Sequence, residues 1–397
     1  MDGQGCKQRH IYPVHDQANV RQANARQADA DGGRGGALAG VRVLEVGGIG
    51  PNPFAGMMLA DMGADVIRLD REPGTGFGQA GVGEPSLRGR QTLAADLTTA
   101  AGVALARALA RRADVLIEGF RPGVMERLGL GPDELLELNP RLVYGRITGY
   151  GQAGPLAGLP GHDINFVALA GLLGASQRVG ERPMFAVNAG ADYGGGAMLL
   201  LFGVLCALLE ARDSGRGQVV DAAMVDGVAL LTTMVHSLRA AGQWDERPGF
   251  NVLDSGAHFY EVYATADGGH LAVGAIEPRF YARLLELLEL PADEFPQWRA
   301  ERWPELKARF AAVFAARAAG EWEALLGAEE VCVTVVRGPF AAPEDPHLRA
   351  RETFVELAGV RQPAPAPRLS RTPALARPAE HDPAAALRRW GVDQTGA

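Results

Sequence analysis

Val41-Arg42-Val43-Leu44-Glu45-Val46-Gly47-Gly48 is an apolar run rich in β-branched residues that ends at two glycines. Apolar runs of this length bounded by glycine are typical of buried strands. Residues 54–62 have the composition of a helix, and residues 64–69 form a second apolar run. Residues 41–69 therefore predict a β-α-β unit, in which a helix joins two parallel strands.

The alternation continues downstream of this unit. Residues 99–111 and 132–138 are predicted helices, and residues 114–117 and 142–147 are predicted strands. Alternating strands and helices predict an α/β fold with a doubly wound, Rossmann-like parallel sheet. Such sheets bind their ligands at the carboxyl ends of the strands.

The turn after the first strand imitates a dinucleotide-binding fingerprint. Gly48 and Gly50 are followed by an acidic residue, Asp70, at the end of the second predicted strand. The third glycine of the fingerprint is missing, and Pro51 and Pro53 occupy the turn. A nicotinamide site is therefore a minor alternative.

The chain as a whole is predicted to hold two domains. Its first residues are rich in Gln, Asn, Arg, Asp and Gly and lack apolar periodicity, which predicts disorder because little apolar surface can be buried. A predicted hairpin around Asp267-Gly268-Gly269 opens a smaller α+β domain. The predicted division is a disordered extension at 1–36, a large α/β domain at 37–230, a linker at 231–257, the smaller domain at 258–345 and a C-terminal segment at 346–397 that returns to the large domain.

Composition excludes several classes of function. The net charge of −8 and the pI near 5.6 argue against nucleic acid as a partner. The three cysteines have neither Cys-x-x-Cys nor Cys/His spacing, so we expect no metal site and no disulfide framework, which fits a cytoplasmic protein. The longest apolar run, residues 197–209, is shorter than the roughly 20 residues that cross a bilayer. It predicts a core helix rather than membrane insertion.

Two stretches pair an ionisable side chain with a predicted helix start. Asp163 precedes the apolar residues 164–173 and is a natural N-cap, and the positive helix end favours a neutral imidazole on His162. Asp192 precedes three glycines and the run 197–209, where backbone N–H groups would hold its carboxylate ionised. A neutral base and a carboxylate at neighbouring helix ends suit proton transfer at carbon. The alternative is that both residues only cap helices.

Three arginines lie just past predicted strands or in the turn that follows one. Arg71, Arg121 and Arg127 occupy these positions, where ligands of a doubly wound sheet bind. Arginine grips phosphate through two parallel hydrogen bonds, so a crevice with several arginines would hold the phosphates of a nucleotide. The alternative for each is a solvated surface arginine.

Several stretches in order carry a family resemblance. They are Gly161-His162-Asp163-Ile164-Asn165 and residues 44–54, 64–71, 120–124, 188–196, 217–222 and 274–278. Together they resemble the α-methylacyl-CoA racemase branch of the family III CoA-transferase superfamily, over residues 38 to 372. The resemblance implies an interlocked homodimer that acts on acyl-CoA thioesters. Coenzyme A is then part of the substrate, and no separate cofactor is expected.

The resemblance also implies roles for particular residues. His162 and Asp192 match the two catalytic bases, Asp163 would act through its backbone N–H, and Glu277 would reach the site from the second subunit to orient His162. Thr98 stands where relatives commonly have lysine, which weakens one coenzyme contact. The coenzyme and substrate contacts implied are Arg71, Ala95, Asp96, Leu97, Thr98, Gly119, Phe120, Arg121, Arg127, Gly161, Ile164, Asn165 and Phe166.

Two reactions are compatible with this resemblance. The first is isomerisation: a base removes the α-proton of a 2-methyl-branched acyl-CoA, and an acid returns a proton to the opposite face of the enolate. The second is CoA transfer between an acyl-CoA and a carboxylate, with Asp192 as the nucleophile. Transfer needs no histidine, and transferases of the superfamily generally lack the motif that contains His162. The sequence therefore favours the isomerase.

Overall fold

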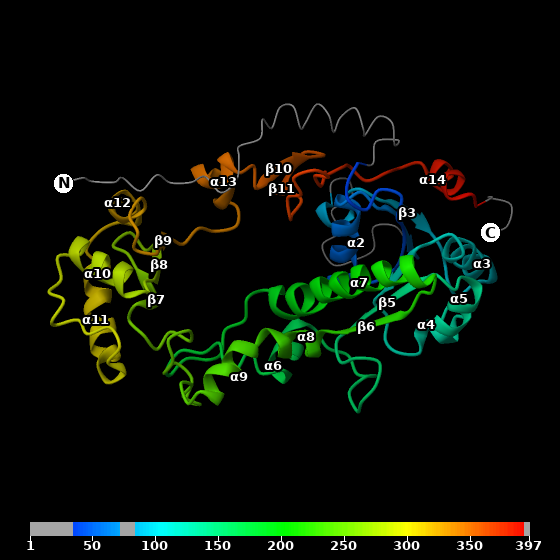
Figure 1. Cartoon of the computed structure of the whole chain (residues 1–397). Coiled ribbons are helices and arrows are strands. Elements are labelled where there is room, and N and C mark those ends of the chain that lie inside the picture. The colour runs from blue at the N-terminus through cyan, green and yellow to red at the C-terminus, as the bar shows by residue number, and fades with distance from the viewer. Residues whose placement is uncertain (1–34, 72–83, 393–397) are drawn as a thin grey trace, which may run out of the picture. The chain divides into compact units, whose positions relative to one another are not determined.

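A computed structural model describes residues 35–71 and 84–392 of the chain (Figure 1). They fall into two compact units that interleave along the sequence. The first unit holds the described residues of Met1–Ile147, Leu200–Asp221 and Val355–Ala397, and the second holds Thr148–Leu199 and Ala222–Phe354. The predicted disorder of residues 1–36 falls almost wholly outside the described residues, and the predicted domain boundaries stay predictions.

The first unit is built on a six-stranded sheet with strand order β3-β2-β1-β4-β5-β6. The pairs β1-β2, β1-β4, β2-β3 and β4-β5 are parallel, which confirms the predicted doubly wound sheet. Its strands are β1 (Arg42–Val46), β2 (Asp65–Asp70), β3 (Gln91–Ala94), β4 (Val115–Glu118), β5 (Val143–Thr148) and β6 (Val219–Ala223). The strand order reverses between β1 and β4, where such sheets open a ligand crevice.

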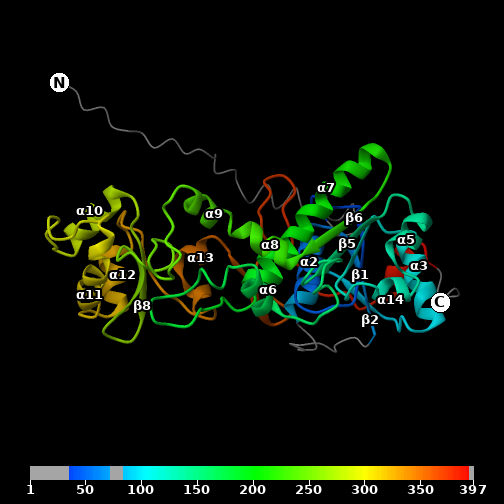
Figure 2. The same ribbon diagram turned by 90° about the horizontal axis from the view of Figure 1, so that it is seen from below.

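Helices cover both faces of this sheet (Figure 2). On one face, α3, α5 and α14 bury an apolar cluster that includes Leu44, Leu109 and Trp390. On the other face, Gly56 of α2 lies against the Glu45 side chain, and Leu200 of α7 lies over Gly145 of β5. The helices lying wholly or mostly in this unit are η1 (Pro85–Leu87), α2 (Pro51–Asp61), α3 (Ala100–Ala110), α4 (Val124–Arg127), α5 (Pro132–Leu138), α7 (Met198–Ser214) and α14 (Pro383–Trp390); a small hairpin, β10 (Phe354–Leu357) and β11 (Val360–Pro363), completes it.

A buried ionic layer lies under α2. Glu45, with none of its side chain exposed, pairs with both Arg68 and Arg90. Arg68 also binds Asp70 at 2.7 Å and the carbonyl oxygen of Gly48 at 3.0 Å. Asp70 is the acid on which the dinucleotide fingerprint depended. Its ion pair with Arg68 gives it a structural partner instead.

The second unit begins with four helical segments. They are α6 (Asp163–Leu169), the π-helix η2 (Ala189–Ala197), α8 (Met224–Leu231) and α9 (Thr233–Ala240). The helix predicted over 164–173 is therefore shorter than expected. The π-helix was not predicted, because Gly194, Gly195 and Gly196 give it no apolar periodicity.

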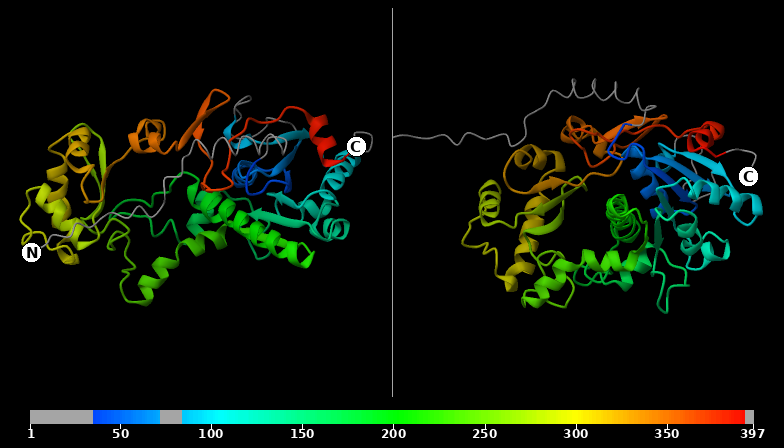
Figure 3. Two further views of the ribbon diagram at one scale, coloured as in Figure 1. Left: turned by 45° about the horizontal axis from the view of Figure 1, so that its top comes forward. Right: turned by 45° about the vertical axis from the view of Figure 1, so that its right-hand side comes forward.

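The rest of the second unit is a smaller α+β assembly. Its antiparallel sheet has the order β7-β8-β9, and the β7-β8 pair confirms the predicted hairpin. In Figure 3 the yellow helices α10 and α11 lie beside this hairpin, where Phe259, Tyr281 and Phe310 form part of an aromatic core. The elements are β7 (Tyr260–Ala264), β8 (His270–Gly274), α10 (Pro278–Leu287), η3 (Ala300–Arg302), α11 (Trp303–Phe314), α12 (Ala319–Leu326), β9 (Val333–Val335), η4 (Ala342–Glu344) and α13 (Pro346–Ala350).

The π-helix η2 continues into α7, so that the predicted apolar run is part of a longer helix. Ala189–Ser214 has 26 residues, which is long and apolar enough to cross a bilayer by length and composition alone. Half of its most apolar window is buried inside the protein, and a core helix passes the same test. The exclusion of membrane insertion stays a prediction.

Candidate active site

His162 is the N-cap residue of α6, and Asp163 is the first helical residue. The prediction that Asp163 caps this helix is therefore wrong by one position. The His162 N–H donates to the Asn165 side-chain oxygen at 3.0 Å, while the Asn165 N–H donates to the His162 carbonyl oxygen at 2.8 Å. This reciprocal pair fixes the His162 backbone, and the residue stays exposed to solvent.

Other residues of the motif hold this turn in place. Phe166 is buried and packs so closely on Gly149 and Gly161 that a Cβ at either glycine would lie within 2.6 Å of its ring. Tyr150 meets the same ring edge to face at 5.0 Å between centroids. Ile164, by contrast, is 41% exposed. Phe166 therefore anchors the motif, while Ile164 and Asn165 face outward and are available to a substrate.

Asp163 is buried, and its carboxylate reaches away from its own helix. Its Oδ2 accepts hydrogen bonds from the N–H groups of Ala191 at 2.6 Å and Asp192 at 2.9 Å. The carboxylate therefore binds the first turn of η2. Sequence reasoning assigned Asp163 an N-cap role on its own helix and a role through its backbone, and it missed this contact.

The sequence predicted that Asp192 lies in front of a helix. It instead lies inside the first turn of η2. Burial is the main cause of the raised pKa of its carboxyl, and the nearby Asp163 charge raises this pKa further. A hydrogen bond from Asn188 at 3.2 Å and the neighbouring His162 act in the opposite direction and lower this pKa. The net direction is upward. The sequence predicted that backbone N–H groups serve the Asp192 carboxylate, but those of Ala191 and Asp192 donate to Asp163 instead.

Glycines set the packing of the helix that carries Asp192. A Cβ on Gly227 of α8 would lie 1.8 Å from the Gly195 carbonyl oxygen, and one on Gly195 would lie 2.8 Å from the Val228 nitrogen. A Cβ on Gly190 would lie 2.8 Å from Val167 of α6. Because real Cβ atoms do not approach so closely, η2 can touch both helices only with glycine at these positions.

Glu277 is the N-cap residue of α10 in the same unit. It is exposed, and its side chain makes no capping hydrogen bond to α10. Its carbonyl oxygen accepts from the Phe280 and Tyr281 N–H groups, both at 3.0 Å. The carboxylate is therefore not used to cap the helix, and its predicted role across a subunit interface stays a prediction.

The predicted coenzyme residues lie in the first unit, past the ends of β2, β3 and β4. Asp96 accepts from the Thr98 hydroxyl at 2.6 Å and the Thr98 N–H at 3.0 Å. These two bonds, together with Arg71 at 3.7 Å, lower the pKa of the Asp96 carboxyl. Ala95 is buried beneath this turn. The turn is thus ordered, and the Arg71 side chain, 76% exposed, is free to reach a ligand.

The loop after β4 carries Gly119, Phe120 and Arg121. Phe120 packs against Gly47, where a Cβ would lie 2.8 Å from its ring, and Gly119 lies beside Asn52. The loops after β1 and β4 therefore touch where the strand order reverses. Arg121 itself is exposed.

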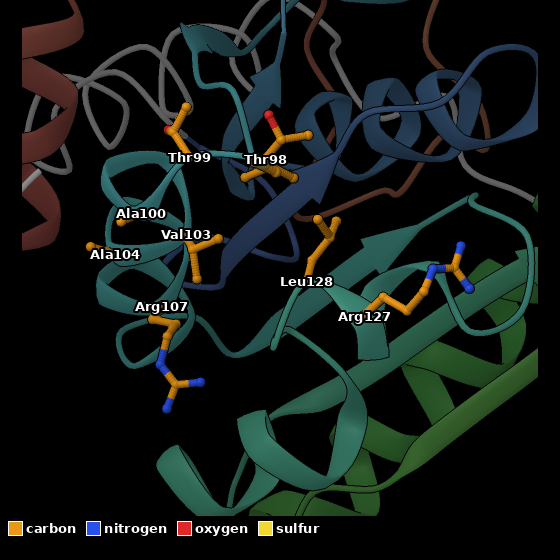
Figure 4. Close-up of a pocket in the computed structure, with 9 residues that line it drawn as sticks. Thr98, Thr99, Ala100, Val103, Ala104, Arg107, Arg127 and Leu128 are labelled. Carbon is orange, nitrogen blue, oxygen red and sulfur yellow. The ribbon is translucent and has the colours of Figure 1, made fainter.

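A cavity of about 420 Å³ lies beside these loops (Figure 4). Its lining includes the predicted residues Leu97, Thr98 and Arg127. Arg71, Phe120 and Arg121 are not part of the lining. The remaining lining residues, which sequence reasoning missed, are Thr99, Ala100, Val103, Ala104, Arg107 and Leu128. Most of these lie on α3 and could have been found from its start directly after the Asp96–Thr98 turn.

Two buried charges and one exposed charge brace the loop and the helix that follows it. Arg146 of β5 donates to Glu118 at 2.8 Å and, through two nitrogens, to Glu126 of α4 at 2.7 and 3.2 Å. Glu118 also accepts from the Phe120 N–H at 2.7 Å. We call Glu118, Arg146 and Glu126 the ionic ladder. It connects β5 both to the loop of Arg121 and to the helix of Arg127.

The sequence pattern described as CoA-transferase family III matches residues 38–385. The chain belongs to this family. The predicted roles that come from this family can now be assigned to the two units. The predicted catalytic residues His162, Asp163, Asp192 and Glu277 all belong to the second unit. The predicted coenzyme residues past β2, β3 and β4 belong to the first.

Among curated relatives, the chain is 44% identical to the α-methylacyl-CoA racemase of Mus musculus, over 90% of this chain and 94% of the relative. It is 43% identical to that of Homo sapiens, over 85% and 88%. A succinyl-CoA–D-citramalate CoA-transferase of Chloroflexus aurantiacus is 32% identical over 85% and 88%. The family thus contains both reactions that the sequence left open.

Solved structures agree on the fold. A CaiB/BaiF family protein from Brucella suis superimposes with a TM-score of 0.78 at 24% identity, over 91% of this chain and all of that one (100%). A protein of Mycobacterium tuberculosis, in an orthorhombic crystal form, gives 0.71 at 27% identity over 87% and 97%. Within the described part of this family III chain, no group of three His, Cys, Asp or Glu could hold a metal ion.

Proposed function

We propose that this chain is an α-methylacyl-CoA racemase, which inverts C2 of 2-methyl-branched acyl-CoA thioesters. The observation that carries the proposal is the strong similarity to two curated racemases over most of the chain. The arrangement around α6 supports it, because His162 and Asp192 lie on helical segments that the Asp163 carboxylate joins. Both groups needed for a 1,1-proton transfer are then present in one unit.

The two groups suit opposite halves of the reaction. His162 is exposed at the start of α6, so its imidazole can reach the α-proton of a bound thioester. Burial raises the pKa of the Asp192 carboxyl, which moves it towards the range suited to general acid–base catalysis. In one direction His162 removes the proton and Asp192 returns one to the other face. In the reverse direction the roles exchange.

The enolate between these steps requires stabilisation of its oxygen. The first N–H groups of a helix have no partner within that helix and carry the positive end of its dipole. At the start of α6, the N–H of Asp163 directly follows His162. We assign the oxyanion-binding role to this N–H, since an oxygen bound there lies next to the base.

Coenzyme A binding is assigned to the first unit. The cavity beside α3 offers an apolar wall from Leu97, Val103 and Leu128, which suits an adenine ring. Arg127 lies at its edge, and Arg71 and Arg121 extend from neighbouring loops. Arginine suits the diphosphate and the further phosphate of coenzyme A, because it binds phosphate through two parallel hydrogen bonds. The coenzyme is part of the substrate, so the reaction requires no additional cofactor.

We further propose a cytoplasmic homodimer that binds neither nucleic acid nor a bilayer. One face of α7 supports self-association, since Met198, Phe202, Leu205 and Leu209 are each at least 40% exposed. Their spacing of three or four residues places them on a single stripe. A continuous apolar stripe on a helix is a common site for a second copy of a chain.

The alternative is CoA transfer with Asp192 as a nucleophile, and the transferase relative keeps it open. The chain is 44% and 43% identical to the two racemases but only 32% identical to this transferase. Racemisation is therefore the better assignment.

Incubation of the protein with a (2R)-2-methylacyl-CoA in deuterated water tests the proposal. A racemase incorporates deuterium at C2 and loses optical purity without any acceptor acid. Exchange of the CoA group onto an added carboxylate, with C2 left unlabelled and optically pure, would establish the transferase instead.

A further inference from the structure

The carboxylate of Asp163 has an unusual target. An acid in the first turn of a helix ordinarily interacts with the N–H groups of its own helix. Asp163 instead accepts from Ala191 and Asp192, which lie 28 and 29 residues further along the chain. With only 6% of the residue exposed, this interaction is largely shielded from water.

These two bonds cap the π-helix from outside. The first N–H groups of a helix need partners, and η2 has no side-chain cap at its own N-cap residue, Asn188. Oδ2 of Asp163 binds two of them at 2.6 and 2.9 Å. The approach depends on Gly190, where any Cβ would strike Val167 of α6.

We propose that the Asp163 carboxylate is a positioning residue that fixes Asp192 relative to His162. Asp163 directly follows His162 in the chain, and one of its hydrogen-bond donors is the N–H of Asp192 itself. The two catalytic groups are thus joined through one carboxylate and two short stretches of backbone. This inference rests on the proposed racemase function.

The same carboxylate sets the charge that Asp192 faces. On α6 the neighbouring groups are Asp163, whose charge raises the pKa of the Asp192 carboxyl, and His162, which lowers it. Asn188 donates a hydrogen bond, Tyr193 lies on the same helix, and α8 contributes Asp226 in its first turn. Removing the Asp163 charge therefore lowers the pKa of Asp192.

Two substitutions separate geometry from charge. Asp163→Asn keeps an oxygen that can accept both N–H bonds but removes the charge. Asp163→Ala removes both. Each variant keeps the backbone N–H that we assign to the enolate oxygen, so any loss of activity comes from the side chain.

We expect Asp163→Ala to lower kcat about a hundredfold, the effect of a misplacement near 1 Å, with KM for the thioester changed less than about twofold. Asp163→Asn should retain more activity, and the limb of its pH–rate profile set by Asp192 should move to lower pH. Amide hydrogen exchange at Ala191 and Asp192 should quicken in the Ala variant and stay slow in the Asn variant.

Asp254 provides a matched control in the same unit. Its carboxylate is also 6% exposed and accepts from the N–H groups of Gly249 at 2.9 Å and Asn251 at 2.7 Å. Asp254→Asn should lower the melting temperature but leave kcat and the pH–rate profile unchanged.

Three results would overturn the inference. One is an Asp163→Ala enzyme with kcat within about threefold of wild type. Another is an Asp163→Asn profile that does not move, and the third is an Asp254→Asn variant that changes kcat and the profile as Asp163→Asn does. A wild-type protein that never exchanges the α-proton would instead refute the racemase function, and hydrogen exchange at Ala191 and Asp192 would still report on the structural link.

Discussion

We propose that Arg71 and Arg121 contribute to coenzyme binding and take no part in the chemistry. Both are exposed and lie past strands of the first unit, whereas the proposed proton-transfer groups lie in the second. Arg121→Ala should therefore raise KM for an acyl-CoA by roughly ten- to a hundredfold, because a charge-assisted hydrogen bond contributes about 1.5–3 kcal/mol. Its kcat should stay near that of wild type in steady-state assays.

A truncated substrate provides the control for this prediction. Thioesters of pantetheine lack the nucleotide phosphates, so Arg121→Ala should leave their KM unchanged. Arg112→Ala replaces an exposed arginine at the far end of α3 and should alter neither substrate. Equal KM values of the wild type for CoA and pantetheine thioesters would contradict phosphate binding by these residues.

His258 is a buried titratable residue outside the site. None of it is exposed, and its Nε2 lies 2.6 Å from the Tyr281 hydroxyl. Burial, and secondarily Lys307, lowers the pKa of His258 to about 4. The unfolded chain binds this proton near pH 6.5. The contribution of neutral His258 to the free energy of unfolding is therefore fully present above pH 6.5. It is lost as the pH falls towards 4 and amounts to about 3 kcal/mol.

Urea unfolding at a series of pH values measures this loss. His258→Gln should lower stability at pH 7 but flatten its change between pH 6.5 and 4. His270→Gln, at an exposed histidine of β8, should keep the wild-type slope. An unchanged slope in His258→Gln would show that another group causes the acid sensitivity.

Residue types could be predicted from the sequence better than their partners. His162 and Asp192 were singled out beside predicted helix starts, and the family resemblance assigned them the catalytic role. The contact from Asp163 to Ala191 could not be, because it joins residues 28 apart through the packing of α6 on η2. His258 is buried, and its ring packs edge to face on Phe259, Tyr281 and Phe310.

Among the elements, the ionic ladder connects the sheet to the loop of Arg121 and to α4, the proposed coenzyme-binding segments. Glu118 is fully buried, so removal of Arg146 would leave its charge without its main partner. Breaking a buried pair in this way costs about 3–5 kcal/mol. Arg146→Ala should therefore lower the free energy of unfolding by that amount. It should also raise KM for acyl-CoA, because Glu118, which accepts from the Phe120 N–H, and Glu126, which neighbours Arg127, lose their shared partner.

Two further variants distinguish the ladder from a general ionic effect. Arg146→Ala combined with Glu118→Gln should recover part of the stability, since the unpaired buried charge is gone. Arg247→Ala breaks an exposed pair with Asp245 and should leave stability and KM unchanged. A stable Arg146→Ala enzyme with normal KM would show that the ladder braces nothing.

Periodicity predicted most elements of the sheet but not all. β1, β2, β4 and β5 are mainly apolar runs, and the structure places them within one or two residues of the prediction. β3 was missed, because Gln91–Ala94 is a short edge strand with little apolar character. The helix predicted over 54–62 begins earlier, at Pro51, since proline suits the first helical position.

At the scale of the whole molecule, the proposed dimer makes a prediction about Glu277. Its carboxylate does not cap α10, so it is available to orient His162 of a second subunit. Glu277→Ala and Asp192→Ala should each be inactive alone. After joint refolding, a mixed dimer has one site with both residues intact, and racemase activity should return.

The control is joint refolding of Glu277→Ala with Glu277→Ala, which should give no activity. Differently tagged chains allow the mixed dimers to be isolated. Mixed dimers that form but stay inactive would show that Glu277 serves its own subunit or has no role in the reaction.

The central claim is that His162 and Asp192 act on opposite faces of one α-carbon. It is tested most directly by measuring deuterium exchange at C2 from each pure enantiomer in His162→Ala and Asp192→Asn. We predict that neither variant racemises and that each still exchanges only one enantiomer, a different one in each case, because each keeps one of the two bases. Racemisation by His162→Ala at the wild-type rate, or exchange of the same enantiomer by both variants, would contradict the two-base assignment.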